Sequence, residues 1–406
     1  MRRLAVLSLH TSPLAQPGQG DSGGMNVYVR ELVSALAQAG VQADVFTRRW
    51  DDLSPEVVEV EPGFRVIHVE AGPPGMAKEQ LPDVVEDFAD GVSAHLRSLG
   101  DVDALHANYW LSGVAGHRLK HELDLPLVST FHTLARVKAE TGDPEPELRV
   151  HAEAEVIACS DAILASCAAE ADQLERLYGA DPARIELVSP GVDHAFFSPG
   201  DRVGARAALA HLDLGTGPVL LFVGRIQPLK GLDVAVRALA ALGRPDARLV
   251  VVGGASGAGG TAGVGRVDKL IAELGVVDQL RMVDPVPHHL LSTYYRAADV
   301  VLVPSRSESF GLVALEAAAC GTPVVAAAVG GLLTLVEHGR TGFLVEGRDP
   351  EAFAAHAEEI LRSPSLAEDL SRQAARRARG YTWSTAAGRL RRVYGDLTAR
   401  ALVDCS

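Results

Sequence analysis

Two carboxylates that lie eight residues apart, Glu308 and Glu316, enclose a segment that reads as a turn from a strand into a helix. Upstream, Asp299 to Pro304 is a short apolar run of strand type. Downstream, Leu312 to Ala319 favours a helix that ends at Gly321. The spacing therefore predicts a strand, a turn and a helix, with one carboxylate before the helix and one two turns into it.

The turn has the composition of an anion site. Free backbone N–H groups at the start of a helix, here those of Phe310, Gly311 and Leu312, carry the positive end of the helix dipole and bind phosphate. Glu308 and Glu316 would then accept hydrogen bonds from hydroxyl groups on either side of that phosphate. A pyrophosphate between two polyols is a sugar nucleotide. The alternative is that Glu308 only caps the helix and Glu316 faces solvent.

A second loop supplies two cations. Phe222-Val-Gly-Arg225-Ile-Gln-Pro-Leu-Lys230-Gly follows an apolar strand from Val219 to Val223 and precedes a periodic helix from about Leu232 to Leu242. Ligands of open parallel sheets bind at the carboxyl ends of the strands, where Arg225 can fork onto phosphate oxygens and Lys230 adds a point charge. The spacing does not match a P-loop. Ordinary solvated cations are the alternative.

Together, the Gly-Arg-x-x-x-x-Lys-Gly loop and the Glu-x7-Glu segment resemble those of the family-four retaining glycosyltransferases, over nearly the whole chain. The resemblance implies an α/β fold of the GT-B type, with two facing Rossmann-like domains and a deep cleft between them. It also implies an α-linked sugar donor whose sugar contacts Glu308, whose ribose is held by Glu316 and whose pyrophosphate lies on Arg225 and Lys230. Ser309, Phe310, Gly311 and Leu312 complete that donor site.

Strand patterns alternate with helical ones in both halves, which predicts parallel sheets covered by helices on both faces. The strands are expected near Leu4–Leu9, Asp44–Thr47, Ala104–Ala107, Leu127–Phe131, Val219, Leu249, Val300 and Val324. A Pro- and Gly-rich linker from Ser189 to Gly200 separates a first domain, 1–190, from a second, 201–383. A terminal helix over about 384–406 is expected to pack back on the first domain.

Composition limits the partners. A chain of 406 residues with 47% hydrophobic content can build two cores, and a net charge of −14 argues against nucleic acid. No apolar run reaches the length of a membrane span, and residues 1–9 read as the first strand rather than a signal peptide. The four cysteines show no metal-finger spacing, so we expect buried thiols in a cytoplasmic protein; they are Cys159, Cys167, Cys320 and Cys405.

The first half carries a glycine-rich loop between a strand and a helix, from His10 to Asn26, followed by helical sequence from Val27 to Gln38. A mobile surface loop is the alternative. This loop, together with His106-Ala-Asn-Tyr109-Trp, is similar to the actinobacterial inositol-phosphate N-acetylglucosaminyltransferases of mycothiol biosynthesis. That similarity implies UDP-GlcNAc as donor and 1D-myo-inositol 3-phosphate as acceptor.

Carried over position by position, the similarity implies a set of ligand-binding residues. The acceptor phosphate would be held by Lys78, Tyr109, Thr133 and Arg149. The inositol ring would contact His10, Asp21, Ser22, Gly23, Gly24, Met25 and Asn26, and the donor would also contact Gln16, Pro17 and Gly24. Two cations with hydroxyl donors suit a phosphate dianion on an acidic protein.

Three positions depart from the family, and four others bear on its metal. Ala107 and Asn108 replace a frequent Ser-His pair, and Val286 stands where some members place an arginine against the base. An optional structural magnesium, held largely by backbone atoms, would map to Tyr295, Arg296, Ala298 and Thr322. A homodimer is left open.

Catalysis is expected to need no metal. Asp101-Val-Asp103 is the one tempting Asp-x-Asp pair and reads as a solvated turn. Arg225, Lys230 and helix N–H groups would therefore neutralise the leaving group, Glu308 would contact the transferred sugar, and His132 would orient a hydroxyl. A hydrogen-bonded structural histidine is the alternative for His132.

Two alternatives for function stay open. One is a transferase of the same fold with another acceptor, of the sucrose-phosphate synthase type. The other is a non-catalytic partner protein that uses its Arg-rich segment, Arg372 to Arg392, although that segment reads more readily as a helix closing the domains. The Gly-rich stretch from Ala255 to Gly265 reads as a flexible connection and is assigned no chemistry.

Overall fold

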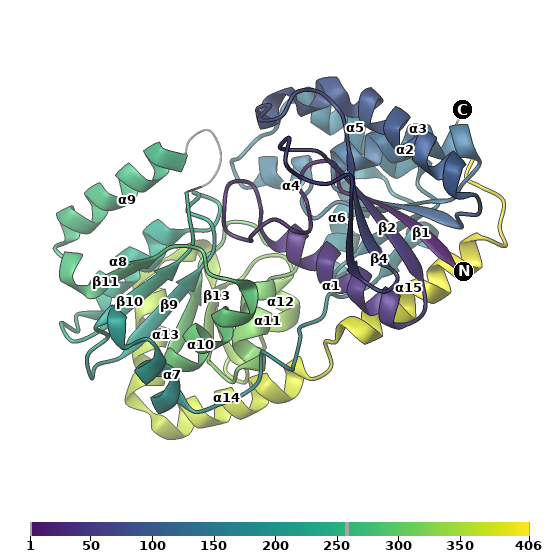
Figure 1. The fold of residues 1–406 in the computed structure, drawn as a ribbon. Helices are drawn as coiled ribbons and strands as arrows, with labels where there is room; N and C mark the ends of the chain where they lie inside the picture. Colours follow the sequence, from purple (N-terminus) through teal and green to yellow (C-terminus); the bar gives the residue numbers. More distant parts are fainter. Residues whose placement is uncertain (1, 256–259, 406) are drawn as a thin grey trace. The chain divides into compact units, whose positions relative to one another are not determined.

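The computed structural model describes residues 2–255 and 260–405. They divide into two compact units. The first unit comprises Met1–Ala15, Met25–Pro190 and Trp383–Ser406, and the second comprises Gln16–Gly24 and Gly191–Thr382. Each unit is built on its own sheet of mainly parallel strands covered by helices (Figure 1), so the predicted α/β class is confirmed.

The sheet of the first unit has the strand order β3-β4-β2-β1-β5-β6-β7-β8. Its strands are β1 (Arg3–Leu7), β2 (Gln42–Arg48), β3 (Val57–Glu61), β4 (Phe64–Val69), β5 (Ala104–Asn108), β6 (Leu127–Thr130), β7 (Ala162–Ala165) and β8 (Ile185–Leu187). Strand β3 pairs antiparallel with β4, whereas the other neighbours are parallel. The alternating patterns predicted parallel sheets, so this antiparallel edge departs from the prediction.

Helices of the first unit bury apolar stripes against that sheet. In α2, Val85, Phe88, Val92 and Leu96 recur at helical spacing and are all buried. The helices are α1 (Gly24–Gln38), η1 (Lys78–Val84), α2 (Val85–Leu99), α3 (Trp110–Leu123), α4 (Ala135–Glu140), α5 (Glu147–Cys159), α6 (Ala168–Tyr178), η2 (Pro182–Arg184) and α15 (Trp383–Leu397).

The sheet of the second unit is parallel throughout, in the order β11-β10-β9-β12-β13-β14. Its strands are β9 (Val219–Val223), β10 (Arg248–Val252), β11 (Leu280–Val283), β12 (Val300–Val303), β13 (Val324–Ala327) and β14 (Gly342–Val345). Its helices are α7 (Arg202–Ala208), η3 (Ala210–Leu212), α8 (Leu232–Leu242), α9 (Gly260–Leu274), η4 (Val277–Gln279), η5 (His288–Leu290), α10 (Leu291–Ala297), α11 (Leu312–Ala319), α12 (Leu332–Leu335), η6 (Glu346–Arg348), α13 (Pro350–Arg362) and α14 (Pro364–Ala378). The predicted strand β9 and helices α8 and α11 are confirmed.

Helix α15 packs in the first unit, although its sequence follows the second. Figure 1 shows it alongside α1, and the rings of Trp383 and Tyr28 lie 5.7 Å apart. The hydroxyl of Tyr394 lies 2.7 Å from Nδ1 of His106, on β5. This contact ties the last helix to the centre of the first sheet.

Three expectations need correction. Residues 16–24 belong to the second unit, although their place in the sequence predicted that the loop lies wholly in the first domain. The stretch from Ala255 to Gly265 was predicted to be a flexible connection. Residues 256–259 of it lie outside the described part of the chain, and from Gly260 on it forms helix α9, so the prediction is wrong for that segment. Cys159 and Cys405 were expected as separate buried thiols, but Cys405 is only partly buried and its sulfur atom lies against that of Cys159, to which the structure joins it.

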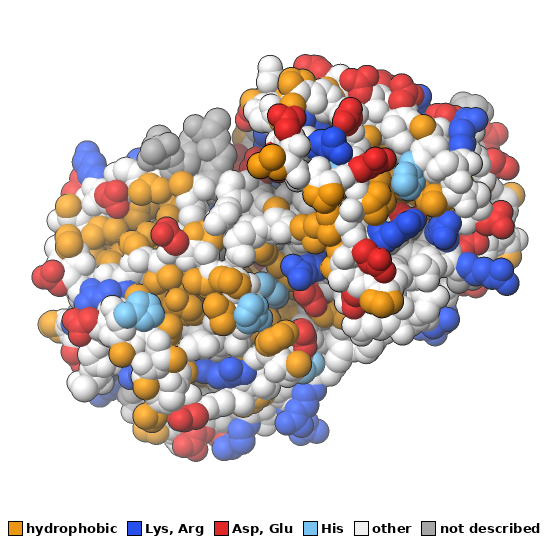
Figure 2. Space-filling view, viewed as in Figure 1, with side chains coloured by type: hydrophobic (Ala, Val, Ile, Leu, Met, Phe, Trp, Pro, Cys, Tyr) orange, Lys and Arg blue, Asp and Glu red, His pale blue; other side chains and the backbone are white. Residues whose placement is uncertain are grey.

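Figure 2 shows acidic and basic side chains interspersed over the visible face of each unit.

Asp103 is part of the fold rather than of a metal pair: its carboxylate accepts hydrogen bonds from the backbone N–H groups of Arg2 and Arg3, at 2.5 and 2.8 Å. Among the described residues, no helix combines the length and the apolar character needed to cross a bilayer.

Candidate functional site

In the second unit, the loops that follow β9, β12 and β13 pack against one another at the carboxyl end of the sheet. Gly231 has a left-handed backbone, with φ of 77°, and a Cβ there would lie 2.3 Å from the carbonyl oxygen of Pro304. A Cβ on Gly331 would lie 2.3 Å from Cα of Phe310. Both positions therefore require glycine, and the close packing fixes the loops that carry the predicted donor residues.

Lys230 and Glu308 come from two of these loops and form an ion pair. Nζ of Lys230 lies 2.7 Å from Oε2 of Glu308, and both side chains are partly buried. The hydroxyl of Ser305 donates to the same oxygen at 3.2 Å. An ammonium group has three donors, so Lys230 can hold Glu308 and still donate to phosphate oxygens.

Arg225 contacts the glycine-rich loop of the second unit. Its Nη1 donates to the carbonyl oxygen of Asp21 at 3.3 Å and lies 3.7 Å from the Asp21 carboxylate. A Cβ on Gly23 would lie 3.3 Å from Nε of Arg225. The amide of Gln16 donates to the backbone carbonyl of Val286 at 2.5 Å. The loop that carries Gln16, Pro17, Asp21, Ser22, Gly23 and Gly24 thus lies beside the predicted pyrophosphate arginine.

Helix α11 begins at Leu312, as predicted, and Gly311 precedes it in a left-handed conformation with φ of 104°. The ring of Phe310 is buried against Tyr381, at 5.8 Å between centroids. The backbone carbonyl of Glu308 accepts a hydrogen bond from the N–H of Gly331 at 2.8 Å. Ser309 and Phe310 are therefore held in the turn by both the ring contact and the glycine loop.

Glu316 is buried, at 4% exposure, and does not face solvent. His288 Nε2 lies 2.7 Å from its Oε1, and the hydroxyl of Tyr295 donates to its Oε2 at 2.7 Å. Burial, with a further contribution from Glu316, raises the pKa of Tyr295 well above its ordinary value, so this hydroxyl keeps its proton. Each carboxylate oxygen retains a lone pair for a hydroxyl of a ligand. His288, Ser305 and Gly331 were not predicted from the sequence, since none of them lies in the two motifs.

The residues of the optional magnesium site meet at the end of α10. The Thr322 hydroxyl donates to the carbonyl of Tyr295 at 2.7 Å, and the N–H of Ala298 lies 3.2 Å from the same carbonyl. The guanidinium of Arg296 donates to the carbonyl of Ser198 at 2.8 Å. This donor set contains no carboxylate, whereas protein magnesium sites normally use one or two. It does not fit a tight magnesium site.

In the first unit, Arg149 draws together two other residues predicted to hold the acceptor phosphate. Its Nη1 donates to the hydroxyl of Tyr109 at 3.1 Å, and its Nη2 donates to the hydroxyl and the carbonyl of Thr133 at 3.0 and 2.9 Å. Arg149 is 3% exposed and also pairs through Nε with the fully buried Glu153 at 2.7 Å. The geometry therefore combines one buried cation with two hydroxyl groups.

Two carboxylates compensate that cation. Burial lowers the pKa of Arg149, but the nearby Tyr109, Glu153 and Glu145 raise it by more, so the pKa lies above its ordinary value. Glu145 lies 3.0 Å from Nη1 of Arg149 and also pairs with Lys138. Glu145 thus bridges two cations in the manner expected of a bound anion. Sequence reasoning missed Lys138 and Glu145, whose contacts depend on the loop between α4 and α5.

His132 follows β6 and lies against Asn108, one of the positions at which this chain departs from the family. Its Nε2 lies 2.9 Å from Oδ1 of Asn108, and its ring meets that of Tyr28 edge-on at 4.9 Å. Burial, with a smaller contribution from His106, lowers the pKa of His132 to about 3. The φ of 61° places His132 in the left-handed region, which residues other than glycine adopt uncommonly. A neutral imidazole can orient a hydroxyl without adding charge.

The remaining acceptor candidates lie in several places. The rings of His10 and Tyr109 are 4.9 Å apart, and the amide of Asn26 donates to the Thr11 hydroxyl at 2.8 Å. Met25 lies in the first turn of α1. Lys78 is exposed at the start of η1, so its approach to the Arg149 group stays a prediction.

Comparisons with known proteins cover nearly the whole chain. Residues 210–377 match the family described as glycosyl transferases group 1, and residues 22–196 match Glycosyltransferase Family 4. A D-inositol 3-phosphate glycosyltransferase of Actinosynnema mirum is 48% identical over 98% of this chain and 97% of its own length. The enzyme of that name from Xylanimonas cellulosilytica is also 48% identical, with the same coverage.

Solved structures give the same picture of the fold. The sucrose-phosphate synthase of Thermosynechococcus elongatus superposes with a TM-score of 0.92 at 34% identity, covering 98% of this chain and all (100%) of that one. The Anabaena protein HepE, solved with UDP and glucose, superposes with a TM-score of 0.80 at 19% identity, covering 97% of this chain and 100% of its own. At that identity the HepE match supports the fold alone.

Proposed function

Because this chain belongs to the family-four glycosyltransferases, we propose that it transfers N-acetylglucosamine from UDP-GlcNAc to 1D-myo-inositol 3-phosphate with retention of configuration, as in mycothiol biosynthesis. The observation that carries the proposal is the convergence of Tyr109 and Thr133 on the buried guanidinium of Arg149. A guanidinium with flanking hydroxyl groups suits a phosphate monoester, which is the group that distinguishes this acceptor from free inositol.

The proposed reaction exchanges one bond at the anomeric carbon for another. The bond from that carbon to the β-phosphate oxygen of UDP breaks, and a bond to an inositol hydroxyl oxygen forms on the same face. The proton of that hydroxyl passes to the departing phosphate, so the products are the glycoside and UDP. In this proposal no protein side chain becomes covalently bound to the sugar.

The donor is assigned to the second unit. Arg225 and Lys230 stabilise the charge that develops on the pyrophosphate, together with the N–H groups at the start of α11. Glu308 accepts hydrogen bonds from the transferred sugar while paired with Lys230. Glu316, oriented by His288 and Tyr295, accepts from the ribose hydroxyl groups.

The acceptor is assigned to the first unit. Its phosphate would exchange with the carboxylate of Glu145, which already bridges Lys138 and Arg149. Such an exchange keeps both cations paired and avoids leaving a buried charge uncompensated. Lys78 would complete the phosphate contacts, and His10 and Asn26 would face the inositol ring. His132 would orient the attacking hydroxyl.

A second candidate is transfer to a sugar phosphate, of the sucrose-phosphate synthase type. It is favoured by the TM-score of 0.92 and the 34% identity to the solved enzyme of that name. The Arg149 group would serve either acceptor, because both carry a phosphate. The two candidates differ in the ring that the phosphate carries and in the donor sugar.

The test is an acceptor and donor panel. Release of UDP is measured with UDP-GlcNAc or UDP-glucose against 1D-myo-inositol 3-phosphate, free myo-inositol and fructose 6-phosphate, and NMR gives the anomeric configuration of the product. We expect the highest kcat/KM for UDP-GlcNAc with the inositol phosphate, and an α-linked product. Preference for UDP-glucose with fructose 6-phosphate would establish the second candidate, and a β-linked product would refute retention.

The phosphate contact is tested with Lys78→Ala. A charge-assisted hydrogen bond contributes on the order of 1.5–3 kcal/mol, so acceptor kcat/KM should fall about ten- to two-hundredfold while donor KM barely changes. The variant should also lose part of the preference for the phosphorylated over the free polyol. The matched control is Lys269→Ala, on α9, where the lysine is exposed beside Glu273 and should not matter.

A further inference from the structure

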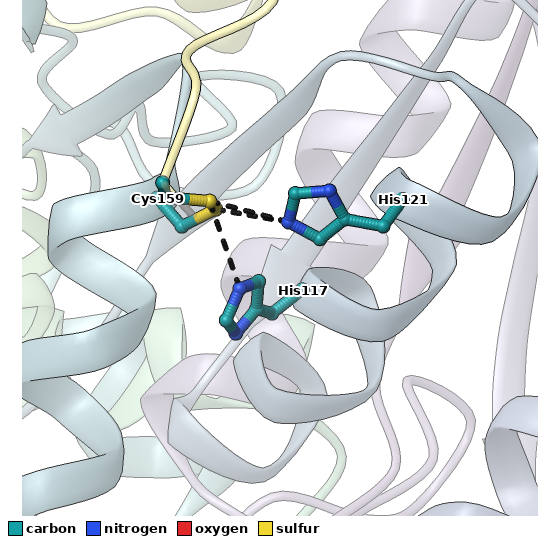
Figure 3. Close-up of side chains that lie close together, drawn as sticks. His117, His121 and Cys159 are labelled. Atoms are coloured by element: carbon teal, nitrogen blue, oxygen red, sulfur yellow. Dashed lines mark hydrogen bonds between the residues drawn. A yellow bond between two sulfur atoms is a disulfide. The ribbon is translucent and has the colours of Figure 1, made fainter.

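In the first unit, four side chains that are not assigned to the donor or the acceptor lie close together. They are His117 and His121 of α3, Cys159 at the end of α5 and Cys405 in the tail after α15. Their imidazole nitrogens and sulfur atoms all lie within 4.8 Å of one another. Figure 3 shows both imidazole rings directed at the sulfur atoms, which the structure joins as a disulfide.

The two histidines lie on one face of α3 because they are four residues apart, one turn of a helix. Nε2 of His121 lies 3.3 Å from the sulfur of Cys159 and 3.2 Å from that of Cys405, and Nε2 of His117 lies 3.8 Å from the sulfur of Cys405. Around a tetrahedral zinc ion, with Zn–S near 2.3 Å and Zn–N near 2.0 Å, sulfur and nitrogen ligands lie about 3.5 Å apart. The observed separations bracket that value.

A disulfide alone does not account for the two imidazoles. It has no proton to donate, and sulfur is a weak acceptor, so it gains little from two rings that both point at it. Two cysteines with two histidines are, by contrast, a standard donor set for structural zinc, and His-x3-His is a usual spacing for its nitrogen ligands. The sequence pattern hid the site because Cys159 and Cys405 are 246 residues apart.

We propose that His117, His121, Cys159 and Cys405 bind one structural zinc ion, with both cysteines as thiolates rather than as a disulfide. Binding displaces two thiol protons to solvent, and two thiolates balance the charge of Zn²⁺ without a change of oxidation state. Forming the disulfide would instead require an oxidant to take two electrons. The thiolate form suits the reducing compartment expected from the sequence.

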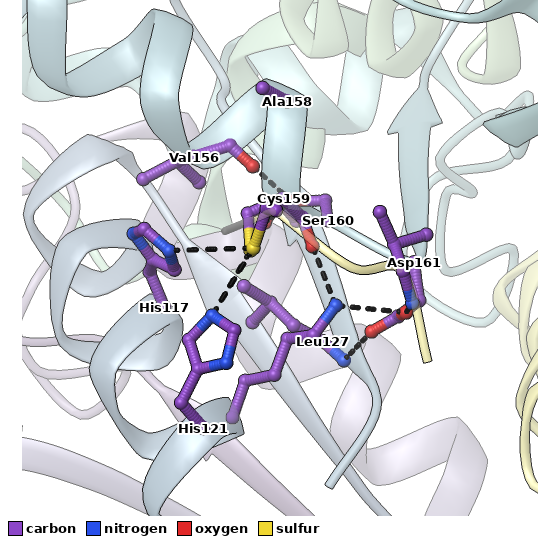
Figure 4. The surroundings of a disulfide bond; sticks show 12 residues. His117, His121, Leu127, Val156, Ala158, Cys159, Ser160 and Asp161 are labelled. Carbon is purple, nitrogen blue, oxygen red and sulfur yellow. Dashed lines mark hydrogen bonds and ion pairs between the residues drawn. A yellow bond between two sulfur atoms is a disulfide. The ribbon is translucent and has the colours of Figure 1, made fainter. Parts of the chain in front are cut away.

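The surroundings place the tail so that Cys405 reaches the cluster. The N–H of Val403 donates to Oδ1 of Asp161 at 2.6 Å, and Asp161 also forms a buried ion pair with Lys120 at 2.9 Å. Nζ of Lys120 donates to the carbonyl of Cys159 at 2.7 Å. Figure 4 shows Cys159 with His117 and His121 on one side and Asp161 on the other. Zinc would therefore fasten the segment after α15 to α3 and α5, and its loss should lower stability.

The first test uses the full-length wild-type protein, purified anaerobically without chelator. Metal content is measured by mass spectrometry, and thiols are counted by alkylation after denaturation with a chelator. We expect one zinc per chain and all four cysteines of the sequence as thiols. Two thiols with no bound metal would overturn the proposal in favour of a disulfide. Four thiols and no zinc uptake on reconstitution would overturn it as well.

The second test uses ligand variants. His121→Ala and Cys405→Ser should each lose the zinc, whereas Cys167→Ala, at a buried cysteine of the first unit outside the cluster, should keep a full equivalent. Cobalt in place of zinc should give the visible absorption of a tetrahedral thiolate site in the wild type but not in Cys405→Ser. Full zinc occupancy in Cys405→Ser would refute the assignment. Because the wild-type measurement stands alone, a variant that fails to fold does not remove the test.

Discussion

The two proposed half-sites are the donor residues of the second unit and the acceptor residues of the first unit, and they are built in opposite ways. In the second unit, backbone loops at the ends of neighbouring strands pack through glycines such as Gly231 and Gly331, and the cations Arg225 and Lys230 remain partly exposed. In the first unit, the central cation, Arg149, is buried and surrounded by side chains from several elements. The donor half-site is therefore fixed by the packing of its backbone loops, and the acceptor half-site by a network of buried polar side chains.

Because of this difference, substitutions in one half-site should mainly change the reaction rate, and those in the other should mainly change the free energy of unfolding. A partly exposed ion pair contributes little to the free energy of unfolding, so its loss should affect the reaction and leave the fold intact. Removing one member of a buried pair leaves its partner charged and unsatisfied, which destabilises the fold. Substitutions in the two half-sites should consequently differ in which measurement changes most.

The largest effect is expected for Arg149→Ala. Glu153 is fully buried and would lose the guanidinium that lies 2.7 Å away, at a cost of about 3–5 kcal/mol in the free energy of unfolding. Denaturant unfolding measures this directly. Arg176→Ala, on α6, is the matched control: it breaks the exposed pair with Glu140, at the end of α4, and should change stability by no more than about 0.5 kcal/mol. Equal stability of both variants would abolish the contrast between the two half-sites.

Next in size is Lys230→Ala. Removing a preorganised positive charge from the leaving group should lower kcat by about a hundredfold or more, with weaker donor binding. The unfolding midpoint should change little, because the lysine is partly exposed. Arg225→Ala should behave in the same way. Wild-type kinetics in a folded Lys230→Ala protein would place the pyrophosphate elsewhere.

The same contrast explains what could be predicted from sequence. Most of the predicted donor residues lie in two contiguous motifs, whose strand β9 and helices α8 and α11 the sequence predicted close to their observed bounds. The predicted acceptor residues are spread from His10 to Arg149, and only a family resemblance grouped them. Their partners Lys138 and Glu145 were missed, because side-chain contacts across a folded loop leave no periodic signal.

Other misses have the same physical origin. The loop from Gln16 to Gly24 was assigned to the first domain by its position in the sequence, but its contacts with Arg225 and Val286 place it in the second unit. Cys159 and Cys405 are neighbours only after the chain folds. Local patterns thus predicted the elements, and long-range contacts decided what they bring together.

A smaller effect is expected from pH. Burial lowers the pKa of His106 to about 3, so the native state stays unprotonated where the unfolded state, with a pKa near 6.5, takes up a proton. The unfolded state then binds more protons, and the free energy of unfolding falls as pH decreases from about 6.5 toward 3, by at most about 1.4 kcal/mol per pH unit per histidine. His106→Gln should reduce this slope between about pH 5 and 6.5, above most carboxylate titration. The exposed His151 gives the control variant His151→Ala, whose slope should match the wild type.

The smallest effect is expected from chelation. If Arg225, Lys230 and helix N–H groups carry the leaving-group charge, a brief exposure to EDTA should leave the initial rate unchanged. Slow loss on long exposure has a separate cause, since removal of zinc from the Cys159–Cys405 cluster would destabilise the fold. That slow component should be absent from Cys405→Ser, whose zinc is already lost, and should follow the fall in thermal stability of the wild type. Immediate loss of activity at unchanged thermal stability, restored by magnesium or manganese, would instead show that the donor half-site needs a metal and that its cations do not suffice.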